Sequence, residues 1–105
     1  MFKKAYKALA NDKSKEKIFN ALNKSLENLV NGISNPNDHK LKGKLAKYRA
    51  CHYDFSVENK EINKKTKNKW IIVYSIEDNG TLYLRATGTH NMYDKINEFL
   101  NINIY

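Results

Sequence analysis

Residues 70–87 read WIIVYSIEDNGTLYLRAT, and this stretch decides the fold. Its first seven residues are almost all apolar, which is typical of a central strand that is covered, at least partly, on both faces. The run Asp78-Asn79-Gly80 favours a type I′ turn, whose central positions both need a positive φ. The stretch therefore predicts two antiparallel strands joined by a tight hairpin.

The returning strand, residues 81–87, alternates in polarity. Its even-numbered residues from Leu82 to Ala86 should fall on one face, and its odd-numbered residues from Tyr83 to Thr87 on the other. If the leucines face the helices, the opposite face of the sheet is open and carries Tyr83 and Arg85. We expect a ligand to lie on that open face.

Two helices are predicted before the sheet. Residues 2–9 and 18–33 carry apolar side chains at helical spacing, with lysines and glutamates opposite the longer stripe. Asp12 or Ser14 would cap the start of the second helix, and Gly32 would help to end it. We expect an antiparallel helix pair whose apolar stripe forms the core.

The remaining segments complete an α+β fold. Residues 34–47 are typical of a loop, and a strand follows at about residues 48–57. Residues 58–69 are polar and indicate a long exposed connection, while residues 92–100 favour a short C-terminal helix. We therefore expect a single domain over residues 1–105. Its order would be α-α-β-β-β-α, with the two N-terminal helices packed on one face of a small antiparallel twisted sheet.

Composition indicates a globular chain of 105 residues, of which 41% are hydrophobic and 29% charged. It contains no apolar run near the ~20 residues that a membrane span needs. Residues 1–6 lack the apolar core of a signal peptide, so the expected location is cytoplasmic with no membrane partner. The single cysteine, Cys51, excludes an intramolecular disulfide and a cysteine-rich zinc site.

The formal charge of +8 is concentrated in the first half of the chain. Two basic clusters stand out: Lys40, Lys42, Lys44, Lys47 and Arg49, and then Lys60, Lys64, Lys65, Lys67 and Lys69. Such asymmetry fits a polyanionic partner, with nucleic acid preferred over a membrane. A solvated lysine-rich surface explains the composition equally well, so charge alone leaves both interpretations open.

The three histidines of the chain stand in three short phrases, DHKLKG at residues 38–43, ACHY at residues 50–53 and ATGTH at residues 86–90. Histidine can both accept and donate a proton near neutral pH. Several histidines on a basic protein indicate RNA cleavage by acid–base chemistry. A three-histidine metal site is a weak alternative, because no close spacing such as His-x-x-x-His supports it.

Four phrases follow one another in a characteristic order: DHKLKG at residues 38–43, YRACH at 48–52, WIIVY at 70–74 and TGTH at 87–90. Together with FKKAYKAL at residues 2–9, they resemble the YafQ branch of the RelE toxins over roughly residues 1–94. The resemblance implies a RelE-like fold and a toxin of a type II toxin–antitoxin pair that enters the ribosomal A site and cleaves mRNA. The implied partners are mRNA, the ribosome and an acidic antitoxin, with no metal and no cofactor.

The resemblance also implies a set of catalytic residues: His39, His52, His90, Arg85 and Tyr93. His52 and His90 would be the acid–base pair for attack of the ribose 2′-OH on the adjacent phosphate. His39 would position the phosphate or take part in proton transfer, and Arg85 would bind the scissile phosphate. Tyr93 would stack on a base or donate a hydrogen bond. The RNA backbone would be bound by Lys42, Lys44, Lys47, Arg49 and Lys69.

The chain departs from the family pattern in its arginine, its last aromatic residue and its aspartate. The family arginine usually stands where this chain has Ala86, one residue after Arg85, and Tyr93 is likewise one position early. A one-residue shift inverts the face of a strand side chain, so Arg85 is equivalent only if the strand bulges. The family aspartate before the central tryptophan is Lys69 here, and Asp54 is the candidate substitute on the face of His52.

Two other functions remain open. The first is a toxin that acts by contact without catalysis, as ParE relatives do on DNA gyrase; such relatives generally lack the histidine set. The second is an RNA-binding module that has lost cleavage, which the displaced arginine and the absent aspartate would explain. Each candidate residue also has a structural interpretation, such as a half-buried strand histidine for His52 or a helix cap for His90.

Overall fold

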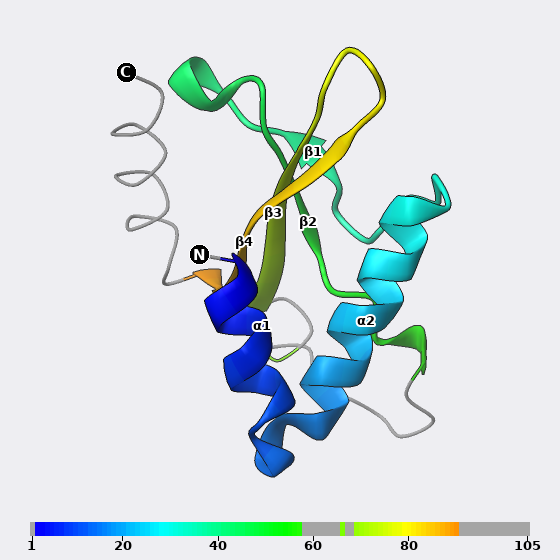
Figure 1. Ribbon diagram of the computed structural model, residues 1–105, viewed down its shortest axis with the longest axis vertical. Coiled ribbons are helices and arrows are strands. Elements are labelled where there is room, and N and C mark those ends of the chain that lie inside the picture. The colour runs from blue at the N-terminus through cyan, green and yellow to red at the C-terminus, as the bar shows by residue number, and fades with distance from the viewer. Residues whose placement is uncertain (1, 58–65, 67–68, 91–105) are drawn as a thin grey trace.

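The computed structural model describes residues 2–57, 66 and 69–90, which form two helices and a four-stranded antiparallel sheet of order β1-β2-β3-β4 (Figure 1). The helices and strands are α1 (Phe2–Ala10), α2 (Glu16–Val30), β1 (His39–Lys40), β2 (Arg49–His52), β3 (Trp70–Ile76) and β4 (Leu82–Thr89). Three single turns of 3₁₀ helix join them: η1 (Lys13–Lys15), η2 (Gly43–Leu45) and η3 (Phe55–Val57).

Helix α2 begins and ends where its sequence signals place it. The Asp12 carboxylate accepts a hydrogen bond from the Ser14 backbone amide at 3.0 Å, which caps the η1 turn leading into α2. At the other end the Ile33 amide donates to the Asn28 carbonyl at 2.8 Å, and Gly32 adopts a φ of 71°. This is a Schellman motif, in which glycine takes the left-handed position at low cost.

The two helices pack on one face of the sheet and form the main core with it. Leu22 and Ala21 of α2 are fully buried against Cys51 of β2 and against Ile72 and Tyr74 of β3. The end of the predicted apolar stripe is an exception. Val30 is 75% exposed and Ile33 is 55% exposed, because they lie at and beyond the end of α2 and do not reach the sheet.

The sheet contains a strand that the sequence did not predict. His39 and Lys40, expected in a loop, form β1 and pair with Ala50 and Arg49 of β2. The strand predicted for residues 48–57 is also shorter, since β2 ends at His52. The helices and strands of the described residues therefore follow the order α-α-β-β-β-β. The expected connection at 58–69 lies largely outside the described residues, and the expected helix at 92–100 lies wholly outside them.

Strand β4 carries a β-bulge that corrects the predicted alternation. Val73 of β3 lies opposite Ala86, whereas Tyr74 lies opposite Leu84, so Arg85 is the extra residue. A bulge of this kind turns two successive side chains toward one face of the sheet. Ala86 consequently leaves the face of the leucines and lies with Arg85 on the side away from the helices.

The face of the sheet away from the helices was expected to be open, but it is partly covered. It bears a second apolar cluster that consists of Leu41, Leu45, Tyr48, Ala50, Ile71, Val73 and Ala86. Leu41 and Leu45 come from the segment around η2, which folds over the sheet. Strand β3 is thus buried on both sides, as its continuous apolar sequence predicts.

Asp54 is fixed by polar contacts to α2. The Ser25 hydroxyl accepts a hydrogen bond from the Asp54 amide at 2.7 Å and donates to the Ala21 carbonyl at 2.7 Å. Asn28 donates to the Asp54 carboxylate at 2.8 Å. These contacts turn the chain toward α2 after His52 and explain why β2 stops there.

Replacing Ser25 by alanine should destabilise the protein. Ser25 is fully buried, so Ser25→Ala leaves the Asp54 amide without its acceptor at a cost of about 1–3 kcal/mol in the free energy of unfolding. Urea denaturation followed by circular dichroism measures the change. Ser34→Ala, at an exposed position, is the matched control and should unfold like the wild type. Equal stability of the two variants would contradict this account.

Candidate functional site

Two of the three histidines meet on the face of the sheet away from the helices. His52 ends β2 opposite Ile71 of β3, which in turn lies opposite Gly88 of β4. His90 follows the last residue of β4, and its Nε2 lies 3.3 Å from the Nε2 of His52. The two rings are nearly perpendicular, at 83°, with centroids 5.3 Å apart. Residues 38 positions apart in the chain are thus brought into direct contact.

The two histidines of this pair have different surroundings. The side chain of His52 is buried, with 9% of the residue exposed, whereas His90 is exposed. Burial lowers the pKa of His52, and the nearby positive charges of His90 and His39 lower it further. His52 is therefore held neutral at neutral pH, and its neutral imidazole can accept a proton from a ligand.

His39 lies on the same face of the sheet as His52. It pairs with Ala50 in the register, and Ala50 precedes His52 by two residues. The Nδ1 atom of His39 donates a hydrogen bond to the Asn37 carbonyl at 2.8 Å, which leaves Nε2 as the acceptor in the neutral ring. Its charge affects the pKa of His52. All three predicted histidines are therefore brought to one region.

Arg85 occupies a different part of this face. Its Nε donates to the Ser75 hydroxyl at 3.3 Å, and its Nη2 lies 3.6 Å from a Glu77 carboxylate oxygen. The guanidinium also lies over the rings of Tyr83, at 4.9 Å, and Tyr48, at 5.8 Å. Ser75 follows Ile71 by four residues along β3, or about 13 Å, so this cluster is separate from the pair formed by His52 and His90.

Tyr48 also belongs to this face of the sheet, although it was not among the residues predicted from the sequence. It is buried in the second cluster, and the Lys47 amine lies 5.3 Å from the centre of its ring. A signal was present, because alternation along β2 places Tyr48 on the same face as Ala50 and His52. Lys47 is exposed beside it, as expected for a residue that binds RNA.

The other predicted RNA-binding residues differ in their surroundings. Arg49 points to the helix side, where its Nε donates to Asp38 at 3.0 Å and Tyr74 donates to the same carboxylate. Hydrogen bonding with Tyr74 and Asp38 raises the pKa of Arg49. Lys42 and Lys69 are exposed, and Lys44 lies in η2.

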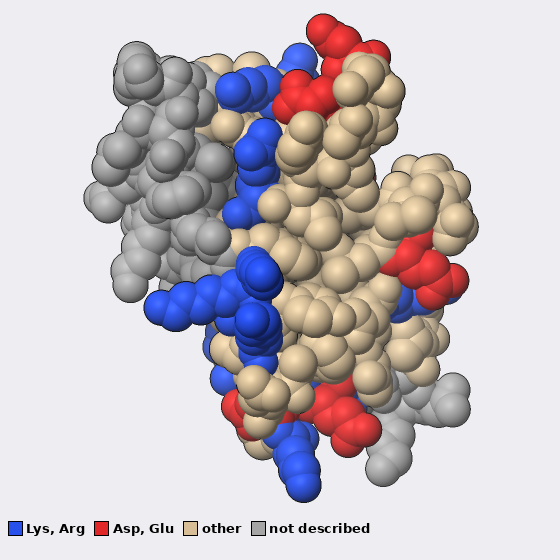
Figure 2. Space-filling view, viewed as in Figure 1, with Lys and Arg blue, Asp and Glu red and all other residues tan. Residues whose placement is uncertain are grey.

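A further group of cations, not singled out from the sequence, lies on α1. Lys3, Lys4 and Lys7 are all exposed there. Figure 2 shows basic side chains in a column that runs over α1 and continues toward the sheet. The spacing of these three lysines places them near one another on a helix, which is the signal that could have identified them.

Asp54 does not lie on the face of His52, which corrects the expectation that it could replace the family aspartate. Its carboxylate is bound by Asn28 and by the Ser56 amide, on the side of α2. Burial by itself would raise the pKa of Asp54, but the hydrogen bonds from Ser56 and Asn28 prevail and lower it. Tyr93 lies outside the described residues, so its predicted role stays a prediction.

Within residues 2–57, 66 and 69–90, no group of three or more His, Cys, Asp or Glu side chains is arranged to hold a metal ion. In the same part of the chain, no helix has the length and apolar character required to cross a membrane. Cys51 is buried, which raises the pKa of its thiol to about 12, and this thiol is not a nucleophile at neutral pH.

An α+β domain with histidines gathered on its sheet has the features of a RelE-superfamily toxin. Comparison with known families agrees, since the model of the family described as bacterial toxin of type II toxin-antitoxin system, YafQ, matches residues 1–95. The chain belongs to the YafQ family of type II toxins. A type II toxin has a cognate antitoxin as its partner. No curated protein and no solved structure matches the chain.

The pKa of His52 should lie below 6.5 and should depend on the other two histidines. In an NMR titration of the imidazole resonances, His90→Gln should raise the pKa of His52, and His39→Gln should raise it less, because each variant removes a nearby positive charge. The imidazole signal that is missing from the spectrum of each variant is the signal of the replaced histidine, which assigns it. Lys17→Gln, an exposed change on α2, should have no effect. A wild-type value at or above 6.5 would refute the assignment of His52 as a neutral base.

Proposed function

We propose that this toxin is a ribosome-dependent mRNA endonuclease that cleaves by acid–base attack of the ribose 2′-OH on the adjacent phosphate, without a metal. The contact between His52 and His90 is the observation that carries the proposal. Burial lowers the pKa of His52 and favours its neutral form, and the exposed His90 lies beside it where an acid partner is needed. The family provides the context, since the chain belongs to a family of type II toxins.

His52 is the general base in this scheme. Its neutral ring removes the proton from the 2′-OH, and the 2′-oxygen attacks phosphorus in line. His90 donates a proton to the 5′-oxygen as the bond from phosphorus to that oxygen breaks. The products are a 2′,3′-cyclic phosphate and a 5′-OH. The base and the acid exchange roles if the cyclic phosphate is then hydrolysed.

The rings of His52 and His90 must separate when the substrate binds. At 3.3 Å between nitrogen atoms they leave no room for a phosphate group. We assign this movement to His90 because His52 is buried within the sheet, whereas His90 is exposed. His39, with Nε2 as its acceptor, is placed to orient the phosphate from β1.

Arg85 would bind the RNA backbone at some distance from the scissile phosphate. It lies on the histidine face, but its guanidinium is held by Ser75 and Glu77 at the hairpin end. This position suits a phosphate farther along the strand better than the one that is cleaved. Its planar fork is well matched to phosphate oxygens. Tyr93 keeps its proposed role in stacking on a base.

The basic surface would carry the contacts with mRNA and the ribosome. Lys42, Lys44, Lys47 and Lys69 are proposed for the RNA backbone, and Lys3, Lys4 and Lys7 extend the charge over α1. Arg49 is the weakest member of the proposed set because it already pairs with Asp38. A net charge of +8 favours an acidic antitoxin as the partner. Action on translating ribosomes would take place in the cytoplasm.

Replacing either histidine of the pair should abolish cleavage. His52→Ala and His90→Ala should each lower the cleavage rate by about 10²–10⁴-fold, the range typical of a lost general acid or base. Mapping of mRNA 5′ ends in a translation reaction, with and without ribosomes, measures this. New ends at A-site codons are expected only with ribosomes and an intact pair. Lys13→Ala, an exposed change on η1, is the matched control and should cleave normally.

The same assay distinguishes the competing functions. If both histidine variants still arrest growth and the mRNA ends do not change, a toxin that acts by contact replaces the nuclease. If the wild-type protein neither arrests growth nor cleaves mRNA, the chain is an RNA-binding protein without catalysis.

Cleavage should persist into mildly acidic solution. A lowered pKa keeps His52 neutral, and therefore active as a base, until the pH falls below the ordinary histidine value of 6.5. Single-turnover cleavage measured against pH should show an acidic limb with its midpoint below 6.5. In His39→Gln this midpoint should move to higher pH, because a positive charge near His52 has been removed. An acidic limb at or above 6.5 in the wild type would exclude His52 as the base.

A further inference from the structure

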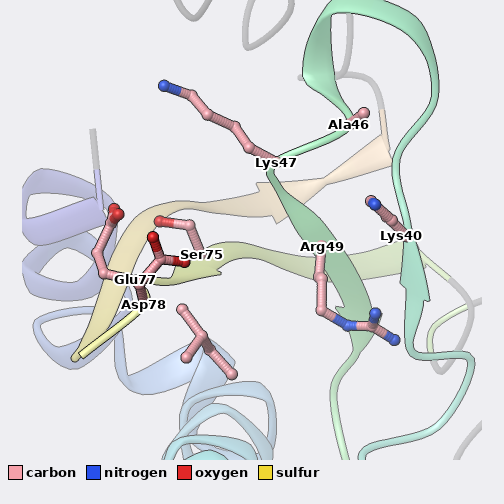
Figure 3. A pocket seen from close by; sticks show the side chains of 8 residues that line it. Lys40, Ala46, Lys47, Arg49, Ser75, Glu77 and Asp78 are labelled. Atoms are coloured by element: carbon pink, nitrogen blue, oxygen red, sulfur yellow. The ribbon is translucent and has the colours of Figure 1, made fainter. Parts of the chain in front are cut away.

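A cavity of about 340 Å³ lies at the far end of the sheet from the histidine pair. It occupies the space between the start of β2 and the end of β3, where the two strands diverge. Figure 3 shows Lys47 and Arg49 leaving the chain in different directions, with Ser75, Glu77 and Asp78 across from them. A volume of this size is within the range of pockets that hold small ligands.

The cavity has two walls of opposite charge. Lys40, Lys47 and Arg49 supply cations on one side, and Glu77 and Asp78 supply carboxylates on the other. Ala46 and Ile76 add apolar surface between these walls. A simple anion would be repelled by the carboxylates, and a simple cation by the lysines. The arrangement suits a ligand that is anionic at one end and carries hydrogen-bond donors at the other.

Pairs within the protein show which charges remain for a ligand. Of the lining residues, Arg49 lies 3.0 Å from Asp38 and Glu77 lies 3.6 Å from Arg85, so these two already have partners of opposite charge. Among the described residues, Lys40, Lys47 and Asp78 have no partner of opposite charge, although Lys47 also lies over the ring of Tyr48, and we assign these three groups to the ligand.

We propose that this cavity is a nucleotide subsite for the mRNA, in which Lys40 and Lys47 bind a phosphate and Asp78 accepts a hydrogen bond from an exocyclic amino group of the base. Carboxylates accept hydrogen bonds from such groups, as from N4 of cytosine, and uracil has none to offer. The subsite would thus favour cytosine over uracil at one position outside the cleaved bond. The choice of RNA as the ligand rests on the proposed nuclease function.

The subsite adjoins the cluster around Arg85 through Ser75 and Glu77, while Lys40 and Arg49 reach it from the helix side of the sheet. Arg85 donates to Ser75 and pairs with Glu77, both of which line the cavity. Tyr83, 44% exposed, lies beside Arg85 and offers a ring on which a base can stack. The separation along β3, about 13 Å from Ile71 to Ser75, corresponds to about four stacked nucleotides at ~3.4 Å each.

The test uses cytidine 5′-monophosphate and uridine 5′-monophosphate, which present different Watson–Crick groups at position 4 of the base. Amide resonances of the full chain are followed by NMR during titration with each nucleotide and with inorganic phosphate. We expect saturable shifts at Ala46, Ser75 and Asp78, with cytidine monophosphate binding about fivefold or more tightly than uridine monophosphate. Lys47→Ala should weaken both nucleotides, and Asp78→Asn should remove the preference between them.

Two exposed charged residues away from the cavity serve as matched controls. Lys13→Ala and Glu16→Gln change exposed charges elsewhere and should leave binding unchanged. Equal binding of the two nucleotides, or equal binding of phosphate alone, would overturn base recognition. Absence of shifts at the cavity would overturn the subsite, as would its occupation by a charged peptide in preference to either nucleotide.

The outcome is independent of cleavage because neither mononucleotide contains the bond to be cut. Nucleotide binding without mRNA cleavage in the translation reaction would refute the nuclease and support the subsite. Cleavage without nucleotide binding would refute the subsite and leave the nuclease standing.

Discussion

Burial of β3 on both faces is the constraint on which the rest of the structure depends. The side chains of Ile72 and Tyr74 point to the helices, and those of Ile71 and Val73 point the other way. An apolar strand with two such faces needs two covers, because exposed apolar surface is costly in water. The helices provide one cover. The segment around η2 contributes to the other, through Leu41 and Leu45.

This second cover creates the environment of the candidate site. His52 lies at the margin of the second cluster, next to Ile71 in the register, and its burial there lowers its pKa. The exposed His90 reaches it from the end of β4. A bare sheet face would have left His52 solvated, whereas its burial lowers its pKa and makes its surroundings unlike those of the exposed His90.

The bulge in β4 explains how the chain can depart from its family by one residue. A regular strand would place Arg85 and Ala86 on opposite faces, so the arginine would point to the helices if Ala86 faced the ligand. The extra residue opposite Val73 removes this conflict, since Arg85 and Ala86 then share a face. Asp54 is not brought to this face by any bulge. Its hydrogen bonds with Asn28 of α2 and with the Ser56 amide hold it on the side of the helices.

Much of the fold could be read from the sequence because the local signals are strong. Apolar periodicity and the glycine at position 32 determined the helices, and the apolar run with Asp78-Asn79-Gly80 determined the central hairpin. The short strand β1 could not be read in this way, because two residues carry no periodicity and pair only once β2 is present.

The resemblance to the family identified His39, His52 and His90 from their places in the four sequence phrases. Only the tertiary structure brought them together, since contact between residues 52 and 90 depends on the register of three strands. It also decided the face of Ala86, which a local bulge moves to the side of Arg85, and the two-walled cavity, whose charges come from segments about 30 residues apart in the chain.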